Sequence, residues 1–523
     1  MKMRPVYSIA TLTCLLGSAF SIPLPDICTK SEIKPTGTST PDTDLEVNQG
    51  IYCPDTDFKA DQDKDRPDVY TTIIKANKKC KRLILQGDIV YKVGRNAISC
   101  MDCLWPKHER GTVNVPYIIS SDYSVNEVSM ITAAMQEFMT LTCVRFVPRS
   151  VETDYLEIKS DDGCWSYIGM TEGTQTLSLR KDACFNHGTI QHELNHALGF
   201  FHEHCRSDRD DYVTIMTQYI SPNDMNNFYK EKTNNLDIQY DYSSLMHYPS
   251  YAFSNDPAKS TIIPKPDPNV PIGQSYGLNN FDISKVNRLY ECDICSNLLT
   301  SQTGKVTSAN YPSGYLNNTN CLWLIRIPAN KVFLTFEAFD VQSSTNCMSD
   351  YVKVYDGASK TSPVLLDKTC GSEMLTSLLA SSNSMLVEFV SDGVVTATGF
   401  KASYSTVHCG GFFNTSSGII TSPGYPNLYP QSVDCMWLIT APSEKVKKVL
   451  LTFDVFNLEM YSYCRYDYVR IYDGRTTSSP VIGTFCGRSS FNRLSSGNAL
   501  LIKFHSDYSN QYPGFHASYK FIG

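Results

Sequence analysis

The segment from His192 to Glu203 contains side chains that could bind a metal ion and move a proton. Its sequence is His-Glu-Leu-Asn-His-Ala-Leu-Gly-Phe-Phe-His-Glu. His192 and His196 are four residues apart, so on a helix they lie on one face and can present two nitrogens to one ion. Gly199 allows the backbone to leave the helix sharply, and His202 can then return as a third ligand. Three protein nitrogens and one open position are the coordination of a catalytic zinc.

Glu193 directly follows the first of these histidines, where it can take a proton from a water molecule that zinc activates. Such a site hydrolyses a bond without a covalent intermediate, so no serine or cysteine nucleophile is needed. His-Glu-x-x-His alone also occurs on solvated helix faces, and it is the added glycine and third histidine that favour zinc. His204 is an alternative third ligand, but the turn spacing favours His202. We therefore interpret His204 as a surface histidine or one that contacts the ligands.

A helix must position the first two histidines, and the sequence predicts one that starts near Phe185 and stops at Gly199. A second helical pattern covers residues 124–141, and strand-like runs cover 113–119 and 156–159. These elements predict a globular α+β domain.

The last part of the chain contains an internal repeat. Asp350-Tyr-Val-Lys-Val-Tyr-Asp-Gly recurs as Asp467-Tyr-Val-Arg-Ile-Tyr-Asp-Gly, and four cysteines recur with it. Alternating runs such as 332–336 and 500–504 indicate half-buried strands. Each repeat is therefore predicted to be an all-β sandwich with two short-range disulfides.

The N-terminus predicts export from the cell. Lys2 and Arg4 precede an apolar run, and small residues up to Ser21 form a cleavage site, so residues 1–21 are expected to be a signal peptide. No other stretch is apolar for long enough to predict a membrane span. A net charge of -7 gives no reason to expect nucleic-acid binding. The 19 cysteines agree with an oxidising, extracellular location.

The histidine motif and its continuation, Arg206-Ser-Asp-Arg-Asp, resemble the signature of the astacin family of metzincin zinc proteases. Ser-Ser-Leu-Met-His-Tyr, which ends at Tyr248, resembles the Met-turn of that family. The resemblance implies a zinc endopeptidase domain over residues 96–294. It also implies that Met246 forms an apolar floor beneath the ligands. Tyr248 would be a displaceable zinc ligand that hydrogen-bonds the developing oxyanion.

Residues 22–95 are expected to be an inhibitory pro-segment. Leu-Gln-Gly-Asp-Ile, ending at Ile89, resembles the astacin motif in which an aspartate, here Asp88, occupies the zinc position meant for water. A cysteine switch is the alternative, because thiolates bind zinc well and the pro-segment contains three cysteines. These are Cys28, Cys53 and Cys80.

Activation is expected to involve cleavage after Arg95, a lone basic residue that suits a trypsin-like protease. In astacins the freed N-terminus folds inward and contacts the glutamate after the third histidine, which is Glu203 here.

The two repeats, residues 295–406 and 409–521, resemble CUB domains, some of which bind calcium through three acidic residues. All three are acidic in the second repeat, which predicts a calcium site there. The first repeat has lost one carboxylate, and its site is expected to be weakened or absent. The positions are Glu459, Asp467 and Asp507 in the second repeat, and Gln342, Asp350 and Asp392 in the first.

Family resemblance also implies the disulfide pairs. Cys205 is left over, either as a buried free thiol or as a partner for a cysteine of another chain or of the precursor segment. The Cys100–Cys103 pair is a feature similar to vertebrate hatching enzymes of this family. The remaining expected pairs are Cys143–Cys292, Cys164–Cys184, Cys295–Cys321, Cys347–Cys370, Cys409–Cys435 and Cys464–Cys486.

The order of signal, pro-segment, protease and two CUB-like units looks like amphibian-type hatching enzymes, whose expected substrates are egg-envelope glycoproteins. The alternative enzyme is a tolloid-like matrix or growth-factor processor, but those interleave EGF modules, for which this chain has no room. The alternative from another class is an inactive CUB adhesion protein, which the intact zinc motif argues against. Asn317 and Asn414 are glycosylation sequons, as expected of an exported chain.

Overall fold

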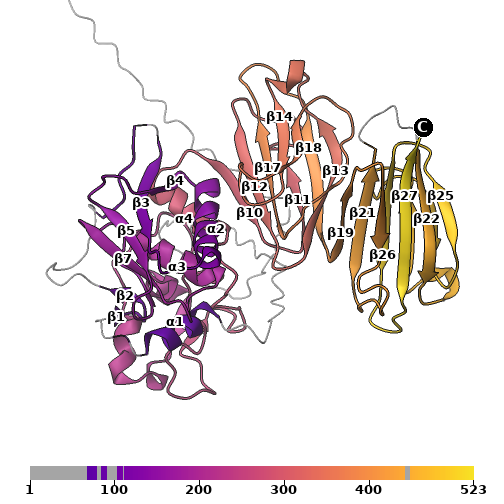
Figure 1. Ribbon diagram of the computed structural model, residues 1–523. Helices are drawn as coiled ribbons and strands as arrows, with labels where there is room; N and C mark the ends of the chain where they lie inside the picture. Colours follow the sequence, from indigo (N-terminus) through magenta and orange to yellow (C-terminus); the bar gives the residue numbers. More distant parts are fainter. Residues whose placement is uncertain (1–67, 79, 81–83, 91–102, 110, 442–447) are drawn as a thin grey trace, which may run out of the picture.

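The computed structural model describes residues 68–78, 80, 84–90, 103–109, 111–441 and 448–523. An α+β module and two β-sandwich units lie in a row along the chain (Figure 1). The expected signal peptide, the Arg95 cleavage site and Cys100 of the expected Cys100–Cys103 pair lie outside the described residues. In the described part of the chain, no helix has both the length and the apolar character needed to cross a bilayer.

The first module is built on a five-stranded sheet of order β4-β3-β5-β7-β6, in which only the short β6 runs antiparallel. Alternation along these strands buries one face against helices, as the sequence pattern predicts. The strands are β3 (Val113–Ile119), β4 (Val144–Pro148), β5 (Tyr155–Lys159), β6 (Cys164–Trp165) and β7 (Thr174–Leu179), with β8 (Val213–Ile215) and β9 (Ile262–Pro264) forming a separate pair.

The predicted helices of this module are present. Ser124 caps the first of them in a capping box with Glu127, and the second ends just before Gly199. The expected pro-segment, residues 22–95, supplies a further short helix and a two-stranded hairpin. The bounds are α1 (Val69–Asn77), β1 (Ile84–Leu85), β2 (Ile89–Val90), α2 (Val125–Leu141), α3 (His187–Ala197), α4 (Asn280–Leu289), and the 3-10 helices η1 (Glu203–Cys205), η2 (Arg209–Asp211), η3 (Thr217–Tyr219) and η4 (Pro222–Phe228).

Each repeat is a two-sheet sandwich, as predicted, and the two share one topology. The first has sheets β10-β12-β17-β14-β15 and β11-β18-β13-β16; the second has β19-β21-β26-β23-β24 and β20-β27-β22-β25. The bounds are β10 (Cys295–Leu299), β11 (Thr303–Thr307), β12 (Asn320–Arg326), β13 (Lys331–Asp340), η5 (Thr345–Cys347), β14 (Tyr351–Tyr355), β15 (Val364–Thr369), β16 (Leu378–Leu379), β17 (Ser384–Val390), β18 (Gly399–Val407), β19 (Cys409–Phe413), β20 (Ser417–Thr421), β21 (Asp434–Thr440), β22 (Lys448–Asn457), η6 (Ser462–Cys464), β23 (Tyr468–Tyr472), β24 (Val481–Phe485), β25 (Phe491–Leu494), β26 (Ala499–His505) and β27 (Gly514–Ile522).

Disulfides fix the module ends. The Cys143–Cys292 bond ties the residue before β4 to the end of the α+β module. Each sandwich holds one bond between two of its strands and one between a 3-10 helix and the residue that follows a strand. Cys164–Cys184 closes a short loop before α3. Cys205 is a buried free thiol, and its burial raises the pKa of the thiol group.

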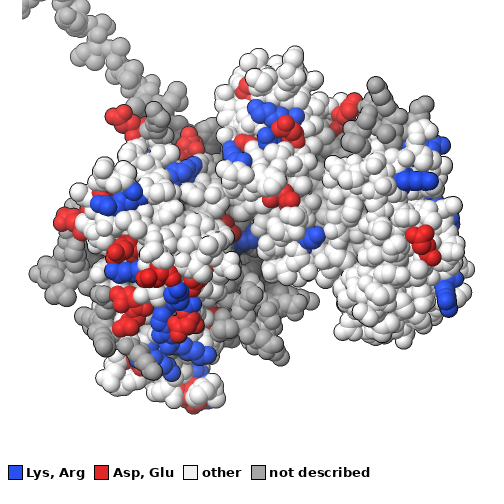
Figure 2. Space-filling model, in the orientation of Figure 1, with Lys and Arg blue, Asp and Glu red and all other residues white. Residues whose placement is uncertain are grey.

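On the face shown in Figure 2, acidic and basic side chains are intermixed on the first module, whereas the second sandwich is mostly uncharged.

Candidate active site

Helix α3 presents two histidines to the interior. The side chain of Asn186 caps its first turn by accepting a hydrogen bond from the Thr189 amide, which is why the helix starts at His187 rather than at Phe185. Gly199 has a φ of 106°, in the left-handed region that favours glycine, and it turns the chain back towards the helix. His202 thereby returns beside the two helical histidines.

The three rings converge through their Nε2 atoms. The Nε2 atoms of His192 and His202 lie 3.2 Å apart. In two of the rings the other nitrogen bonds a backbone carbonyl, since His192 Nδ1 lies 3.2 Å from Leu245 O and His196 Nδ1 lies 2.6 Å from Phe200 O. Such contacts fix ring orientation and leave Nε2 for a metal ion.

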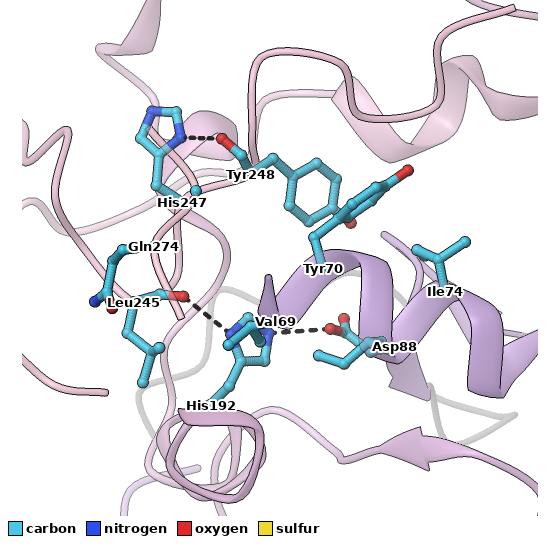
Figure 3. Close-up of a pocket in the computed structure, with 11 residues that line it drawn as sticks. Val69, Tyr70, Ile74, Asp88, His192, Leu245, His247, Tyr248 and Gln274 are labelled. Carbon is cyan, nitrogen blue, oxygen red and sulfur yellow. Dashed lines mark hydrogen bonds and ion pairs between the residues drawn. The ribbon is translucent and has the colours of Figure 1, made fainter. Parts of the chain in front are cut away.

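Asp88 of the expected pro-segment lies at the point where the rings converge, and its contact with His192 is visible in Figure 3. Its carboxylate oxygens are 3.0 Å from His192 Nε2 and 3.4 Å from the Nε2 atoms of His196 and His202. Burial alone would raise the pKa of Asp88, but the neighbouring histidines, His202 first, hold it well below its ordinary value. Asp88 is therefore a buried anion among three imidazoles.

The donor atoms of this cluster suit zinc. One atom from each of the four side chains lies within 4.8 Å of the others, and all four residues are buried. Asp88 Oδ1 and His196 Nε2 have no hydrogen-bond partner in the described part of the chain, although both are buried. These two atoms lie 3.4 Å from each other, too far for a good hydrogen bond, and a metal ion bound between them would satisfy both. Three imidazole nitrogens and one carboxylate oxygen form a set that zinc takes.

Glu193 lies beside the cluster, fully buried, and neither of its carboxylate oxygens has a hydrogen-bond partner among the described residues. Burial first, and then the charge of Asp88, raise the pKa of Glu193 well above its ordinary value. A carboxyl group with a raised pKa beside a metal site can accept and return a proton near neutral pH.

Met246 and Tyr248 lie on the turn beneath the histidines, and both are buried. The Met246 carbonyl accepts a hydrogen bond from the Glu203 amide at 2.9 Å, which fastens the turn to the third histidine. The Tyr248 hydroxyl donates to the backbone carbonyl of Gln86 in the pro-segment. Of the two interpretations of His204, the surface position is wrong, and the contact with a ligand histidine is confirmed, since its ring centroid lies 5.6 Å from that of His202. Its ring is fully buried and stacks on Tyr248 with centroids 4.0 Å apart, so it supports that side chain.

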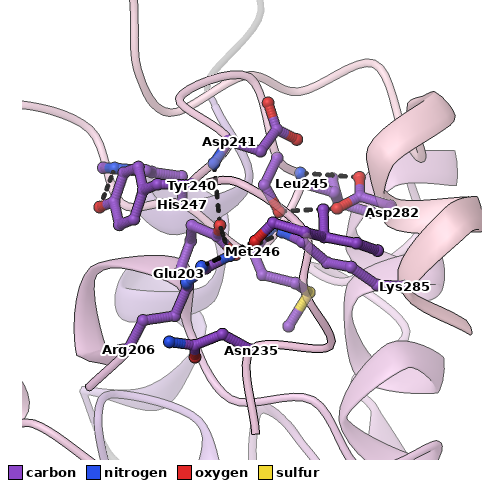
Figure 4. Close-up of polar contacts among 12 residues, drawn as sticks. Glu203, Arg206, Asn235, Tyr240, Asp241, Leu245, Met246, His247, Asp282 and Lys285 are labelled. Carbon is purple, nitrogen blue, oxygen red and sulfur yellow. Dashed lines mark hydrogen bonds and ion pairs between the residues drawn. The ribbon is translucent and has the colours of Figure 1, made fainter. Parts of the chain in front are cut away.

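Glu203 is engaged in a buried polar network beneath the turn (Figure 4). Its carboxylate accepts from Lys285 Nζ at 2.6 Å, from Arg206 Nη1 at 3.1 Å and from the Asp241 amide at 2.9 Å. Asp282 accepts from the Leu245 amide at 3.0 Å, so helix α4 holds the turn from the other side. Lys285 was not predicted from the sequence, because no motif around it indicates that it contacts Glu203.

Two further residues of the expected pro-segment hold Asp88 in place. Neither was predicted from the sequence to belong to the site. Gln86 Oε1 lies 3.1 Å from His202 Nδ1, and Gln86 Nε2 donates to Glu231 at 2.8 Å. Asn77 donates to the carbonyls of Gly87 and Cys164 at 2.8 and 2.6 Å. Gln86 belongs to the same short motif as Asp88, which is the one signal that could have found it. Helix α1 and Asp88 line a pocket together with His192 and Tyr248.

The second sandwich contains the other acidic cluster. Glu459, Asp467 and Asp507 each offer an oxygen within 4.8 Å of the other two. Glu459 Oε2 is buried without a hydrogen-bond partner among the described residues. In the first sandwich Gln342 takes the place of Glu459, since the backbone amide of each donates to a tyrosine hydroxyl, at 3.0 and 3.2 Å.

The fold and this site define a zinc-dependent peptidase, and comparison with known proteins agrees. A model of the astacin peptidase family matches residues 103–291, and a CUB-domain model matches residues 295–404 and 409–519. The chain is 50% identical over 461 residues to Embryonic protein UVS.2 of Xenopus laevis, covering 88% of this chain and 89% of that protein. It is 47% identical over 393 residues to Astacin-like metalloendopeptidase of Gallus gallus, covering 75% and 94%.

Among solved structures, High choriolytic enzyme 1 of Oryzias latipes, a hatching enzyme zinc-protease, is 49% identical. The match covers 38% of this chain and 100% of that chain, with a TM-score of 0.37. The sequence matches carry the assignment. The chain therefore belongs to the astacin family of zinc metalloendopeptidases and has two CUB domains after the protease domain.

Proposed function

We propose that this protein is a secreted hatching enzyme that hydrolyses peptide bonds in egg-envelope glycoproteins. The similarity to Embryonic protein UVS.2 over 89% of that protein's length supports an embryonic role. The observation that carries the enzymatic part is the convergence of three histidines beside the buried, unpartnered Glu193. Residues 1–21 would direct export, and Asn317 and Asn414 would carry glycans.

We assign His192, His196 and His202 as the zinc ligands of the active enzyme. Zinc, when bound, supplies a Lewis acid that polarises the scissile carbonyl and makes water a nucleophile near neutral pH. Glu193, buried beside the cluster and without a hydrogen-bond partner among the described residues, takes a proton from the attacking water and delivers it to the leaving amine. The Tyr248 hydroxyl, once released from Gln86, donates a hydrogen bond to the developing oxyanion. Met246 forms the floor of the site.

Latency in this proposal rests on Asp88, whose carboxylate would bind zinc together with the three histidines in the precursor. Cleavage after Arg95 by a trypsin-like protease separates residues 22–95 from the protease domain. Loss of the pro-segment exposes the histidines and frees Tyr248 at the same time, because both contacts come from the same hairpin. The new N-terminus would contact Glu203, whose carboxylate already binds Lys285 and Arg206. We place the mature boundaries at 96–294, 295–406 and 409–521.

We further propose that Glu459, Asp467 and Asp507 bind one calcium ion in the second CUB domain. The acidic oxygens and the unpartnered Glu459 Oε2 support this assignment. No calcium ion is proposed for the first domain, because a glutamine amide at the matching place supplies no negative charge.

The test of the hatching role is digestion of isolated egg envelope by the trypsin-activated full chain. Glu193→Gln enzyme and a chelator-treated sample are the controls, and a generic peptide is followed in parallel. Envelope digestion that is lost in both controls supports the proposal. Cleavage of the peptide with an intact envelope would contradict the hatching role and favour a matrix or growth-factor processor. Inactivity towards both substrates would favour an adhesion protein.

A further inference from the structure

Arg326, the last residue of β12, joins the first CUB domain to the protease domain. Its side chain is 9% exposed, and Nη1 donates to Glu137 Oε2 on α2 at 2.6 Å. Nη2 donates to the backbone carbonyl of Leu278 at 2.7 Å. Burial would raise the pKa of Glu137, but the charge of Arg326 and then that of His187 lower it to about 2. The pair is therefore ionised, and each buried charge depends on the other.

Glu137 connects Arg326 to the helix that carries two of the active-site histidines. Glu137 Oε2, which accepts from Arg326, also accepts from Gln191 Nε2 at 2.8 Å. Gln191 is fully buried and immediately precedes His192. The other oxygen, Oε1, lies 3.1 Å from Nε2 of His187 in the first turn of α3. One carboxylate thus holds α3 at two turns and is itself held by the CUB domain.

The second contact of Arg326 fixes the loop that forms one wall of the active-site pocket. The Leu278 amide donates to Gln191 Oε1 at 2.9 Å while the Leu278 carbonyl accepts from Arg326, so this residue lies between α3 and the CUB domain. A Cβ atom at Gly277 would lie 2.4 Å from Gln191 Oε1 and 2.7 Å from Arg326 Nη1. The loop leads from there to Gln274, which lines the pocket (Figure 3).

The internal repeat shows that Arg326 is a departure from the CUB pattern. Arg326 ends β12 and Thr440 ends β21, at the same position of the same strand in the two domains. In both cases a matching apolar face packs against the preceding domain. The first domain adds the charged guanidinium group of Arg326 to this contact, whereas the second domain has the uncharged Thr440 at that position. The faces consist of Leu322, Leu324, Tyr355 and Leu386 in the first domain, and Met436, Leu438, Tyr472 and Leu501 in the second.

We propose that Arg326 is a positioning residue of the protease and that the first CUB domain is thereby an integral part of the catalytic unit. Arg326 acts through Glu137 and Gln191 on helix α3, and through Leu278 on the pocket wall. The proposal rests on the zinc site assigned above, because α3 carries two of its ligands.

The test is the kinetics of the activated full chain on a peptide too short to reach the CUB domains. Arg326→Thr introduces the residue that the second domain already carries at this position, so the strand accepts it. We expect kcat to fall about 10- to 100-fold, the loss typical of a small displacement of catalytic groups, while zinc stays at one ion per chain. Arg326→Lys retains the positive charge but lacks the guanidinium group that makes both contacts. It should restore part of the lost kcat. Arg488→Thr, at an exposed arginine of the second domain, is the matched control.

A double variant separates positioning from charge compensation. Arg326→Thr combined with Glu137→Gln removes the uncompensated carboxylate, so its melting temperature should return towards that of the wild type while kcat stays low. Recovery of kcat together with the melting temperature would overturn the proposal, as would an Arg326→Thr enzyme with unchanged kcat. If Arg326→Thr does not fold, the kcat of the double variant tests the proposal in its place: a low kcat supports the proposal, and a wild-type kcat overturns it. A wild-type chain that neither binds zinc nor cleaves the peptide would instead refute the zinc site itself.

Discussion

Replacing Asp88 by alanine should give a precursor that hydrolyses peptides without being cleaved. In the structure Asp88 is the pro-segment side chain that reaches the three histidines, at 3.0 to 3.4 Å, and it is buried. Alanine at this position leaves the histidine cluster open to water. The rest of the pro-segment still docks through Asn77 and Gln86, so the variant should remain folded.

The size of the effect follows from the burial of this contact. Removing one partner of a buried ionic contact costs about 3 kcal/mol or more. Each 1.4 kcal/mol changes an equilibrium about tenfold, so the open form of the precursor should become about 100-fold more populated. Hydrolysis by the uncleaved Asp88→Ala precursor should therefore rise about 100-fold above that of the wild-type precursor.

The assay is cleavage of a quenched fluorogenic peptide by purified precursor in which Arg95 is replaced by glutamine, which prevents activation during purification. Adding Glu193→Gln to the same chain controls for contaminating proteases. Cys80→Ser is the matched control for a cysteine switch, because Cys80 is the pro-segment free thiol nearest in sequence to the motif. An Asp88→Ala precursor that hydrolyses the peptide no faster than the wild-type precursor would refute the reasoning. A Cys80→Ser precursor that hydrolyses the peptide would support the cysteine switch in its place.

The remaining predictions concern the catalytic side chains, the calcium site and the polar network beneath the turn. Glu193→Gln should lower kcat of the activated enzyme by about 10²- to 10⁴-fold with zinc retained, since it removes the general base; kinetics and metal analysis check this together. Tyr248→Phe should lower kcat about 10²-fold with little change in KM, because it removes one oxyanion donor. Glu459→Gln should abolish the rise in melting temperature that calcium gives the second CUB domain, and an unchanged rise would exclude this site. Burial first, and then the charge of Asp241, raise the pKa of Asp282 from 3.8 to about 6. This carboxyl therefore contributes stability that is fully present below pH 3.8 and is lost as pH rises through 6. In Asp282→Asn the melting temperature should lose that part of its pH dependence, and an unchanged pH profile of the melting temperature would contradict the prediction.

Local patterns in the sequence were enough to predict the modules and the centre of the site. His192, His196 and His202 lie within one short segment, so their spacing on a helix and a glycine turn determines where they meet. Repeated cysteines and alternating strands likewise predicted two sandwiches of the same topology.

Contacts between distant parts of the chain could not be predicted in the same way. Lys285 reaches Glu203 across 82 residues, and Arg326 reaches Glu137 across 189. Neither residue has a neighbour in sequence that indicates its role. The contact of Lys285 depends on how helix α4 packs within the protease domain, and that of Arg326 depends on how two domains pack. His204 shows the same limit, because the sequence left open whether it lies at the surface or contacts the ligands, and the fold buries it against Tyr248.

The most direct test of the account is the zinc content and peptide hydrolysis of the activated full chain, measured on the same samples with and without His202→Ala. The account expects one zinc ion per chain and efficient cleavage in the wild type, with both lost in the variant. Chelation should abolish wild-type cleavage, and added zinc should restore it. Cleavage that persists without zinc, or a His202→Ala chain that binds zinc and cleaves as the wild type does, would contradict the assignment of this site.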